Sequence, residues 1–486
     1  MKPDYDAIVI GTGIGGSACA ALLAAAGFKT LVLEKNERIG GMSSSYEKEG
    51  FIIDSAIHVF SSGIKGRFGK IMKKIGLDTL KFVNITDRLA IRALGQKKFI
   101  HLALNTNALG KGNGPSFKGD SRDIDLSHMG FRKDDMMVLM KIMGNIFQLS
   151  KRKLRQMHEE KLTFETYLKQ FSPSSGIKSF LAFLAGGMFG LPPRMASAPE
   201  LIRGLREWIF TNDLSYPIGG AIAVPRVFLD GVIKYGGEIR TNTKVTKIII
   251  ENGKAIGVIV DDKPISSKFV VSNAGIKPTL RTLVGTNYFD RDYVEKVEGL
   301  ISSYSAVTFK FALKEPLIDK YVFANLYHGD LSVFGEKERT PGGPKATGFM
   351  VMIPSNADPN LVPPGHQLII FGTLAPTSPR NWKEWTDYYY KEILKFYPTI
   401  EEKTLFVDIT TPLDLQRLSG KAFGPIETTA LTPDQSGPYR ISSELPIEGL
   451  YVVGDTAGTN THGIGTQLAA DSGIKGAEII IKKYKG

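Results

Sequence analysis

Cysteine and long apolar runs are scarce in this chain of 486 residues. The single cysteine, Cys19, excludes an intramolecular disulfide, which suits a reducing compartment such as the cytosol. Its place among alanines predicts a small core residue and not a redox thiol. The longest apolar stretch, residues 180–191, is broken by glycines and falls short of the about 18 residues that a membrane span needs. Because no signal peptide is recognisable before the first strand, we expect a cytoplasmic protein.

Metal-binding spacing and nucleic-acid modules are also lacking. The seven histidines show no HxxxH or HxH spacing, so we predict no metal site. No recognised nucleic-acid module accompanies the net charge of +12, so no nucleic-acid partner is predicted. Residues 141–155 join an apolar stripe to the basic cluster Lys151-Arg152-Lys153. This pattern predicts either an amphipathic helix with a solvated basic face or peripheral docking on an anionic membrane.

The first 34 residues, by contrast, contain a complete nucleotide-binding pattern. An apolar strand at 6–10 leads into the glycine-rich segment 11–16, a helix of small residues at 17–26 and a second strand at 28–33. Glu34 follows at about the 20-residue offset expected for an acid that binds a ribose diol. A strand, a glycine turn, a helix and an acid in this order predict a Rossmann-like dinucleotide site.

Each glycine of this segment has a physical role. Gly11 permits the tight turn, Gly13 allows a pyrophosphate to approach the backbone, and Gly16 allows close packing of helix and sheet. The helix N-terminus offers N–H groups and the positive end of a dipole to the phosphates. A glutamate at position 34 argues against a ribose 2′-phosphate, and both NAD and FAD remain compatible with this segment.

Later segments favour FAD. Gly40-Gly41 follows the ribose acid, and residues 51–58 form an apolar stretch that ends at His58. Residues 448–455 form a second apolar strand ending in Gly454-Asp455, and residues 461–468 lead into a terminal helix. No second dinucleotide fingerprint appears, so the chain has no separate NAD(P)H domain of its own.

This order resembles the large flavoprotein group with the GxGxxG…E…GG signature, which includes amine oxidases, phytoene desaturases and retinol saturases. Residues 411–440 have the layout of the phytoene desaturase, carotenoid isomerase and retinol saturase branch. The resemblance implies non-covalent FAD, with Val245 at the adenine and Asp455 at the ribityl or phosphate region. It implies the following cofactor-binding residues: Gly11, Gly13, Ile14, Gly15, Gly16, Glu34, Lys35, Gly40, Gly41, Met42, Ser43, Val245, Asn273, Ala274, Gly454, Asp455, Gly463, Ile464 and Thr466.

Two positions depart from the pattern. Met42 stands where the family usually has arginine beside the phosphates, so neutralisation must come from backbone amides, Arg38 or another base. Asp455 is absent from many carotenoid desaturases, which loosens the assignment to one substrate.

The length and the 42% apolar content predict two intertwined domains of an α/β protein. We expect a discontinuous Rossmann-like FAD-binding domain and a discontinuous α+β substrate domain. The first would comprise 1–75, 215–285 and 425–486, and the second 76–214 and 286–424. The first insert reads as largely helical, with helices at 134–158, 163–171, 177–185 and 198–210. The second predicts strands at 305–313, 345–353 and 366–373 and a helix at 381–396, and 105–120 reads as a mobile loop.

The expected chemistry is that of the flavin. His58 and His462 are the ionisable side chains nearest the expected isoalloxazine ring, and each is a candidate acid or base. The sequence favours an FAD oxidoreductase acting on carbon–carbon bonds of a hydrophobic isoprenoid or polyene. An amine-oxidase-like flavoenzyme and a non-catalytic FAD-binding protein remain as alternatives. The electron acceptor or donor is left open.

Overall fold

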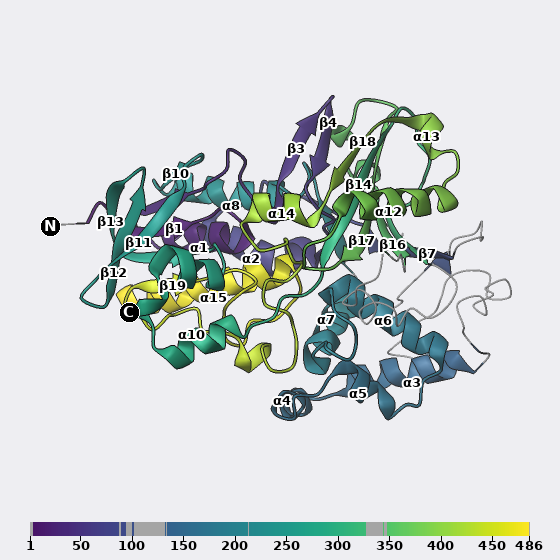
Figure 1. Ribbon diagram of the computed structural model, residues 1–486, viewed down its shortest axis with the longest axis horizontal. Helices are drawn as coiled ribbons and strands as arrows, with labels where there is room; N and C mark the ends of the chain where they lie inside the picture. The colour runs from purple at the N-terminus through teal and green to yellow at the C-terminus, as the bar shows by residue number, and fades with distance from the viewer. Residues whose placement is uncertain are drawn as a thin grey trace.

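Two large β-sheets organise the chain, the first at the left of Figure 1 and the second at its upper right. The computed structural model describes residues 3–86, 89–93, 100–101, 132, 134–211, 213–326, 344 and 348–485. The predicted loop at 105–120 lies outside these residues.

The first sheet has a parallel core extended by an antiparallel meander. Its order is β10-β2-β1-β13-β12-β11, with β19 also pairing with β13. The pairs among β10, β2, β1, β13 and β19 are parallel, whereas β11, β12 and β13 pair antiparallel. The strands are β1 (Tyr5–Ile10), β2 (Thr30–Leu33), β10 (Glu238–Arg240), β11 (Val245–Glu251), β12 (Lys254–Val260), β13 (Lys263–Ser272) and β19 (Leu450–Val452).

Successive residues of these strands enter different cores, as the two-residue period of a strand requires. Val9 and Val32 pack in one core with four helices, whereas Ile8 and Leu31 pack in another with β11 and β12. The four helices are α1 (Ile14–Ala25), α2 (Arg67–Ile75), α8 (Ala223–Lys234) and α15 (Thr466–Lys485). The predicted strand–turn–helix–strand unit and the Rossmann-like fold class are confirmed.

The second sheet is built from both inserts, in the order β18-β14-β17-β16-β15-β7-β8. Phe309, Phe311 and Tyr389 are buried where α12 (Trp382–Phe396) covers one face of this sheet. The alternate residues of β14, Ala306 and Thr308, line a cavity on the other face. The strands are β7 (Leu89–Ala93), β8 (Ile100–His101), β14 (Ser305–Leu313), β15 (Val322–Leu326), β16 (Gly348–Met352), β17 (Gln367–Ala375) and β18 (Thr404–Thr410).

A layer of helices lies below the second sheet in Figure 1 and packs in one core with it. The predicted single helix at 134–158 is wrong, because the structure has two helices there. Leu149 leaves the helical conformation, and the Ser150 hydroxyl accepts the Lys153 N–H at 3.1 Å as the N-cap of the second helix. The helices are α3 (Asp135–Gln148), α4 (Lys151–Glu159), α5 (Phe164–Lys169), α6 (Ser175–Phe189) and α7 (Ala198–Thr211).

The first insert also contains strands that the sequence reading missed. β7 pairs with β15 and so extends the second sheet, while β6 (Phe82–Asn84) pairs with β9 (Leu214–Pro217). Each strand of the first sheet comes from the predicted FAD-binding segments, and each strand of the second comes from the two inserts. The domain boundaries themselves stay a prediction.

Candidate functional site

A cavity of about 800 Å³ lies between the first sheet, the second sheet and helix α6. It begins where β1, β2, β13 and β19 end, which is where open parallel sheets bind their ligands. Three distant parts of the chain therefore meet around it. The predicted residues that line it are Gly11, Gly13, Ile14, Gly15, Glu34, Lys35, Gly40, Gly41, Met42, Ser43, His58, Val245, Asn273, Ala274, Gly454, Asp455, Ile464 and Thr466, whereas Gly16, Gly463 and His462 are not among its lining residues.

The first glycine turn packs too closely against neighbouring backbone for side chains at Gly15 and Gly16. A Cβ atom at Gly15 would lie 2.6 Å from Gly454 Cα, and one at Gly16 would lie 2.2 Å from the Gly11 carbonyl oxygen. Gly16 thus serves the packing of the turn, which explains its place outside the lining. Helix α1 begins after Gly13 without a side-chain cap, so its first N–H groups are available to phosphate oxygens.

Glu34, the predicted ribose acid, accepts hydrogen bonds at both carboxylate oxygens. Glu34 is 4% exposed. One carboxylate oxygen accepts the Thr12 N–H at 3.0 Å and the Thr12 hydroxyl at 2.6 Å, and the other accepts two N–H groups of Asn36. The Thr12 hydroxyl oxygen also accepts the Gly40 N–H at 3.0 Å. Thr12 therefore ties the ribose acid to the second glycine turn, a role that the sequence reading did not assign.

The two glycine turns face each other. Gly40 and Gly41 have φ values of +99° and +56°, which favour glycine. A Cβ atom at Gly41 would lie 3.4 Å from Gly13 Cα. The backbone groups of the two glycine turns therefore lie on either side of the position at which the motif predicts the pyrophosphate. These residues fit a dinucleotide.

Basic side chains at the cavity come from elsewhere than expected. Arg38 lies over the ring of Tyr46, 5.1 Å from its centroid, and is not a lining residue. The lysines that line the cavity are Lys35, Lys244 and Lys421. Of these described lysines, Lys421 is paired with Asp455, so Lys35 and Lys244 are the candidate counter-charges for phosphates where Met42 replaces the usual arginine.

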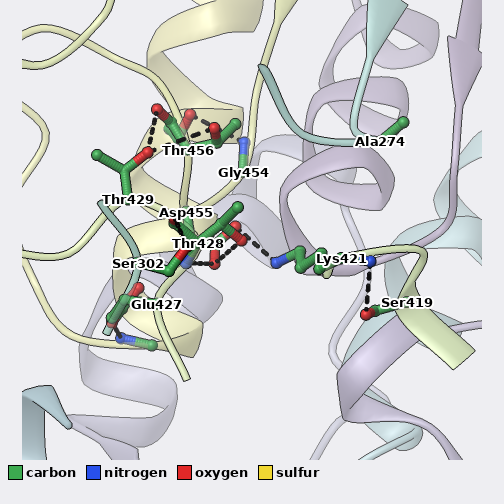
Figure 2. Close-up of polar contacts among 12 residues, drawn as sticks. Ala274, Ser302, Ser419, Lys421, Glu427, Thr428, Thr429, Gly454, Asp455 and Thr456 are labelled. Atoms are coloured by element: carbon green, nitrogen blue, oxygen red, sulfur yellow. Dashed lines mark hydrogen bonds and ion pairs between the residues drawn. The ribbon is translucent and has the colours of Figure 1, made fainter. Parts of the chain in front are cut away.

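Asp455 is the centre of a buried polar cluster after β19. Figure 2 shows Lys421 and Thr428 converging on its carboxylate. Lys421 Nζ lies 2.7 Å from one oxygen, and the Thr428 N–H and hydroxyl donate to the other at 2.8 and 2.7 Å. Burial raises the pKa of Asp455, but Lys421 and Thr428 outweigh it, so the pKa lies below its usual value.

The two candidate histidines have different surroundings. His58 lines the cavity, and its Nδ1–H donates to the Ala56 carbonyl at 3.0 Å. Burial lowers the pKa of His58, which favours the neutral ring. His462 Nδ1 lies 3.0 Å from the buried carboxylate of Glu200, which also contacts His158 Nε2 at 3.0 Å. Burial raises the pKa of Glu200, but the two imidazoles outweigh this and lower it to about 2.

The far end of the cavity is apolar. Phe183, Leu184 and Met188 of α6 face it, as do Trp208 and Met350. The aromatic side chains of Tyr216, Phe309 and Phe311 belong instead to the hydrophobic core. His58 is the ionisable side chain among the described lining residues at this end.

The described residues contain no cluster of three or more His, Cys, Asp or Glu side chains arranged to hold a metal ion. No helix among them combines the length and the apolar content needed to cross a bilayer.

Comparisons with known proteins agree with this geometry. The chain is 26% identical to a chloroplastic prolycopene isomerase of Daucus carota, over 93% of this chain and 76% of that protein. It is 24% identical to an all-trans-retinol 13,14-reductase of Danio rerio, over 93% and 83% of the two chains. The crystal structure of an oxidoreductase from Methanosarcina mazei has the same fold, with a TM-score of 0.70, 20% identity and coverage of 98% and 100%.

Residues 14–481 match the family described as flavin containing amine oxidoreductase. This range includes nearly all of the cavity-lining segments, and the predicted cofactor, FAD, and the predicted oxidoreductase class are confirmed with it. The chain belongs to the flavin containing amine oxidoreductase family.

Proposed function

We propose that this oxidoreductase acts on carbon–carbon bonds of a hydrophobic polyene or isoprenoid, with a hydride passing between a substrate carbon and flavin N5. The observation that carries the proposal is the apolar end of the cavity. Its lining from α6, Trp208 and β16 offers contact surface to a long hydrocarbon and excludes water from the reacting atoms. The relatives named for prolycopene and all-trans-retinol support a conjugated substrate.

An amine substrate fits this lining less well. An ammonium group needs a carboxylate or another negative partner when it leaves water. The carboxylates among the described lining residues are Glu34 and Asp455, which belong to the dinucleotide segments. Lys310 lies two residues beyond Thr308 on β14, but it donates to the Thr410 hydroxyl at 2.6 Å and is not a lining residue. Among the described residues, no lysine lines the apolar end of the cavity.

The two histidines take different proposed roles. Because a carbonyl accepts only, the Ala56 contact places the proton of neutral His58 on Nδ1, which leaves Nε2 as the proton acceptor. We assign His58 the role of acid or base for a substrate proton. His462 is hydrogen-bonded to Glu200, so we propose that it holds the turn before α15 in position. The remaining predicted cofactor contacts stay part of the proposal.

Access to a water-insoluble substrate suggests contact with a membrane surface. Met137 and Met140 on α3 are 58% and 42% exposed. The basic side chains of α4 are exposed as well, while Ile142 and Ile146 of α3 are buried in the core. We propose that this exposed surface of α3 and α4 touches anionic lipid. Sedimentation with anionic and with neutral vesicles tests this, and equal recovery from both would contradict it.

The function itself is tested by anaerobic bleaching of the yellow purified protein. A panel of apolar polyenes and a panel of amines are mixed with the oxidised form, and the same polyenes are mixed with the dithionite-reduced form. We expect bleaching or re-oxidation with polyenes alone. Bleaching by an amine and not by a polyene would favour an amine oxidase. No spectral change with any compound would favour a non-catalytic flavoprotein.

A further inference from the structure

Glu427 is a fully buried carboxyl group whose role the proposed function does not explain. It is 0% exposed and lies in the loop after α14 (Pro412–Ser419). One oxygen accepts the Gly465 N–H at 2.5 Å, while the other has no hydrogen-bond partner among the residues that the structure describes. Gly465 and Ile426, on either side of this contact, both line the cavity. Glu427 therefore lies directly behind the cavity wall.

Three charged side chains face Glu427 from different elements. They are Asp455 after β19, Arg440 after the short helix at Gly437–Tyr439, and Lys421 after α14. Burial, followed by the Asp455 charge, raises the pKa of Glu427 to about 8, against the Gly465 N–H, Arg440 and Lys421. The carboxyl group therefore keeps its proton at neutral pH and has lost most of it at pH 9.

The charge of this group matters because Gly465 immediately precedes α15. The N-terminus of a helix carries a positive partial charge, which favours a nearby anion. The resemblance to the flavoprotein group implies that this terminus points at the flavin pyrimidine, where negative charge appears on reduction. A neutral Glu427 leaves the helix end free to stabilise that charge. An ionised Glu427 would occupy the same positive end and repel it.

We propose that Glu427 is a positioning residue that links proton uptake to flavin reduction, through its contact with Gly465 at the start of α15. Two electrons and one proton enter the flavin as a hydride. When Glu427 is ionised beforehand, its carboxylate binds a second proton from solvent, and no bond forms between Glu427 and the flavin. The negative charge of the reduced flavin raises the proton affinity of Glu427. By thermodynamic reciprocity, proton binding at Glu427 favours reduction of the flavin, so the reduction equilibrium depends on pH.

The midpoint potential of the bound flavin, measured anaerobically against reference dyes from pH 7 to 10, tests this proposal. In the wild-type protein, each pH unit above about 8 should change the reduction equilibrium by an additional factor of ten, which is ~30 mV for a two-electron couple. E427Q keeps an oxygen for the Gly465 N–H but cannot ionise, so the additional slope should vanish. E478Q makes the same chemical change at an exposed site on α15 and should behave as the wild type.

A second measurement needs no variant. Reduction of the wild-type protein in weakly buffered solution with a pH indicator should bind more protons at pH 9 than at pH 7.5, by up to one proton per flavin. A constant proton count across this range, or an E427Q potential that steepens as the wild type does, would overturn the proposal. Neither measurement requires the substrate, so failure here is distinct from failure of the proposed function.

Discussion

Filling the apolar end of the cavity at Gly187 provides the most direct test of the substrate assignment. Gly187 is an exposed residue of α6 that lines the cavity. Among the described residues, and apart from the backbone of its own helix, a Cβ atom there would meet one heavy atom within 4 Å, Met350 Sδ at 3.9 Å, which is an ordinary van der Waals contact. A leucine at this position can therefore extend into the cavity without displacing the helix.

The size of the effect follows from the four carbons that leucine adds. A substrate that can no longer bury an equal amount of hydrocarbon loses ~0.8 kcal/mol per methylene group, or about 3 kcal/mol. At about 1.4 kcal/mol per tenfold change, this weakens substrate binding roughly 200-fold. Glycine inside a helix costs about 0.8–1.0 kcal/mol relative to alanine, so Gly187→Leu should fold at least as well as the wild type.

The assay compares wild type, G187A and G187L for FAD content, thermal unfolding and KM for a polyene that bleaches the flavin. FAD content and unfolding temperature should be retained in all three proteins, and KM should rise steeply in G187L alone. A G187L protein whose KM stays within about twofold of the wild-type value would refute the reasoning. Loss of FAD from G187L would show instead that the two ends of the cavity are assigned the wrong way round.

Three further predictions concern single side chains. E34Q should bind FAD about 10- to 100-fold more weakly, because hydrogen bonds to a charged group contribute roughly 1.5–3 kcal/mol; ultrafiltration measures this, and E37Q, altered at an exposed acid, serves as the control. Cys19 should resist a thiol reagent in the native protein and react once after denaturation, since burial raises the pKa of its thiol to about 12; rapid labelling of the folded chain would contradict this. Burial lowers the pKa of His58 in the folded protein, so the unfolded chain binds a proton at this residue before the folded chain does. The free energy of unfolding that this residue contributes above about pH 6.5 is therefore lost as the pH falls further. H58N should lose less stability than the wild type between pH 7.5 and 5.5, and equal losses would count against a buried neutral imidazole.

Local patterns in the sequence were sufficient to predict the strand–turn–helix–strand unit and the cofactor class, whereas the individual cofactor contacts stay a prediction. The turn from β1 to α1, the acid Glu34 and the pair Gly40-Gly41 are close in sequence, and their spacing carries the geometry. The strand after 448 could be placed because its apolar run ends in Gly454-Asp455. Segments of this kind lie in the cavity wall as expected.

Features that depend on tertiary packing could not be predicted in this way. The break at Ser150 between α3 and α4 is, by contrast, a local N-cap signal that was overlooked because the amphipathic pattern continues through it. Lys421 and Glu427 are single charged residues in a loop, without a motif around them. They become part of the site only because the fold places Asp455 beside Lys421 and Gly465 beside Glu427.

The packing of α1 against α15 has a consequence for biosynthesis. Lys485 donates to the carbonyl of Ala26 across a separation of 459 residues, so the earliest and latest of these segments to leave the ribosome must meet. Since domains form from the N-terminal side during translation, the glycine turn before α1 is synthesised long before α15, the helix that completes its core. A nascent chain stalled before α15 would lack the helix that completes the core around α1.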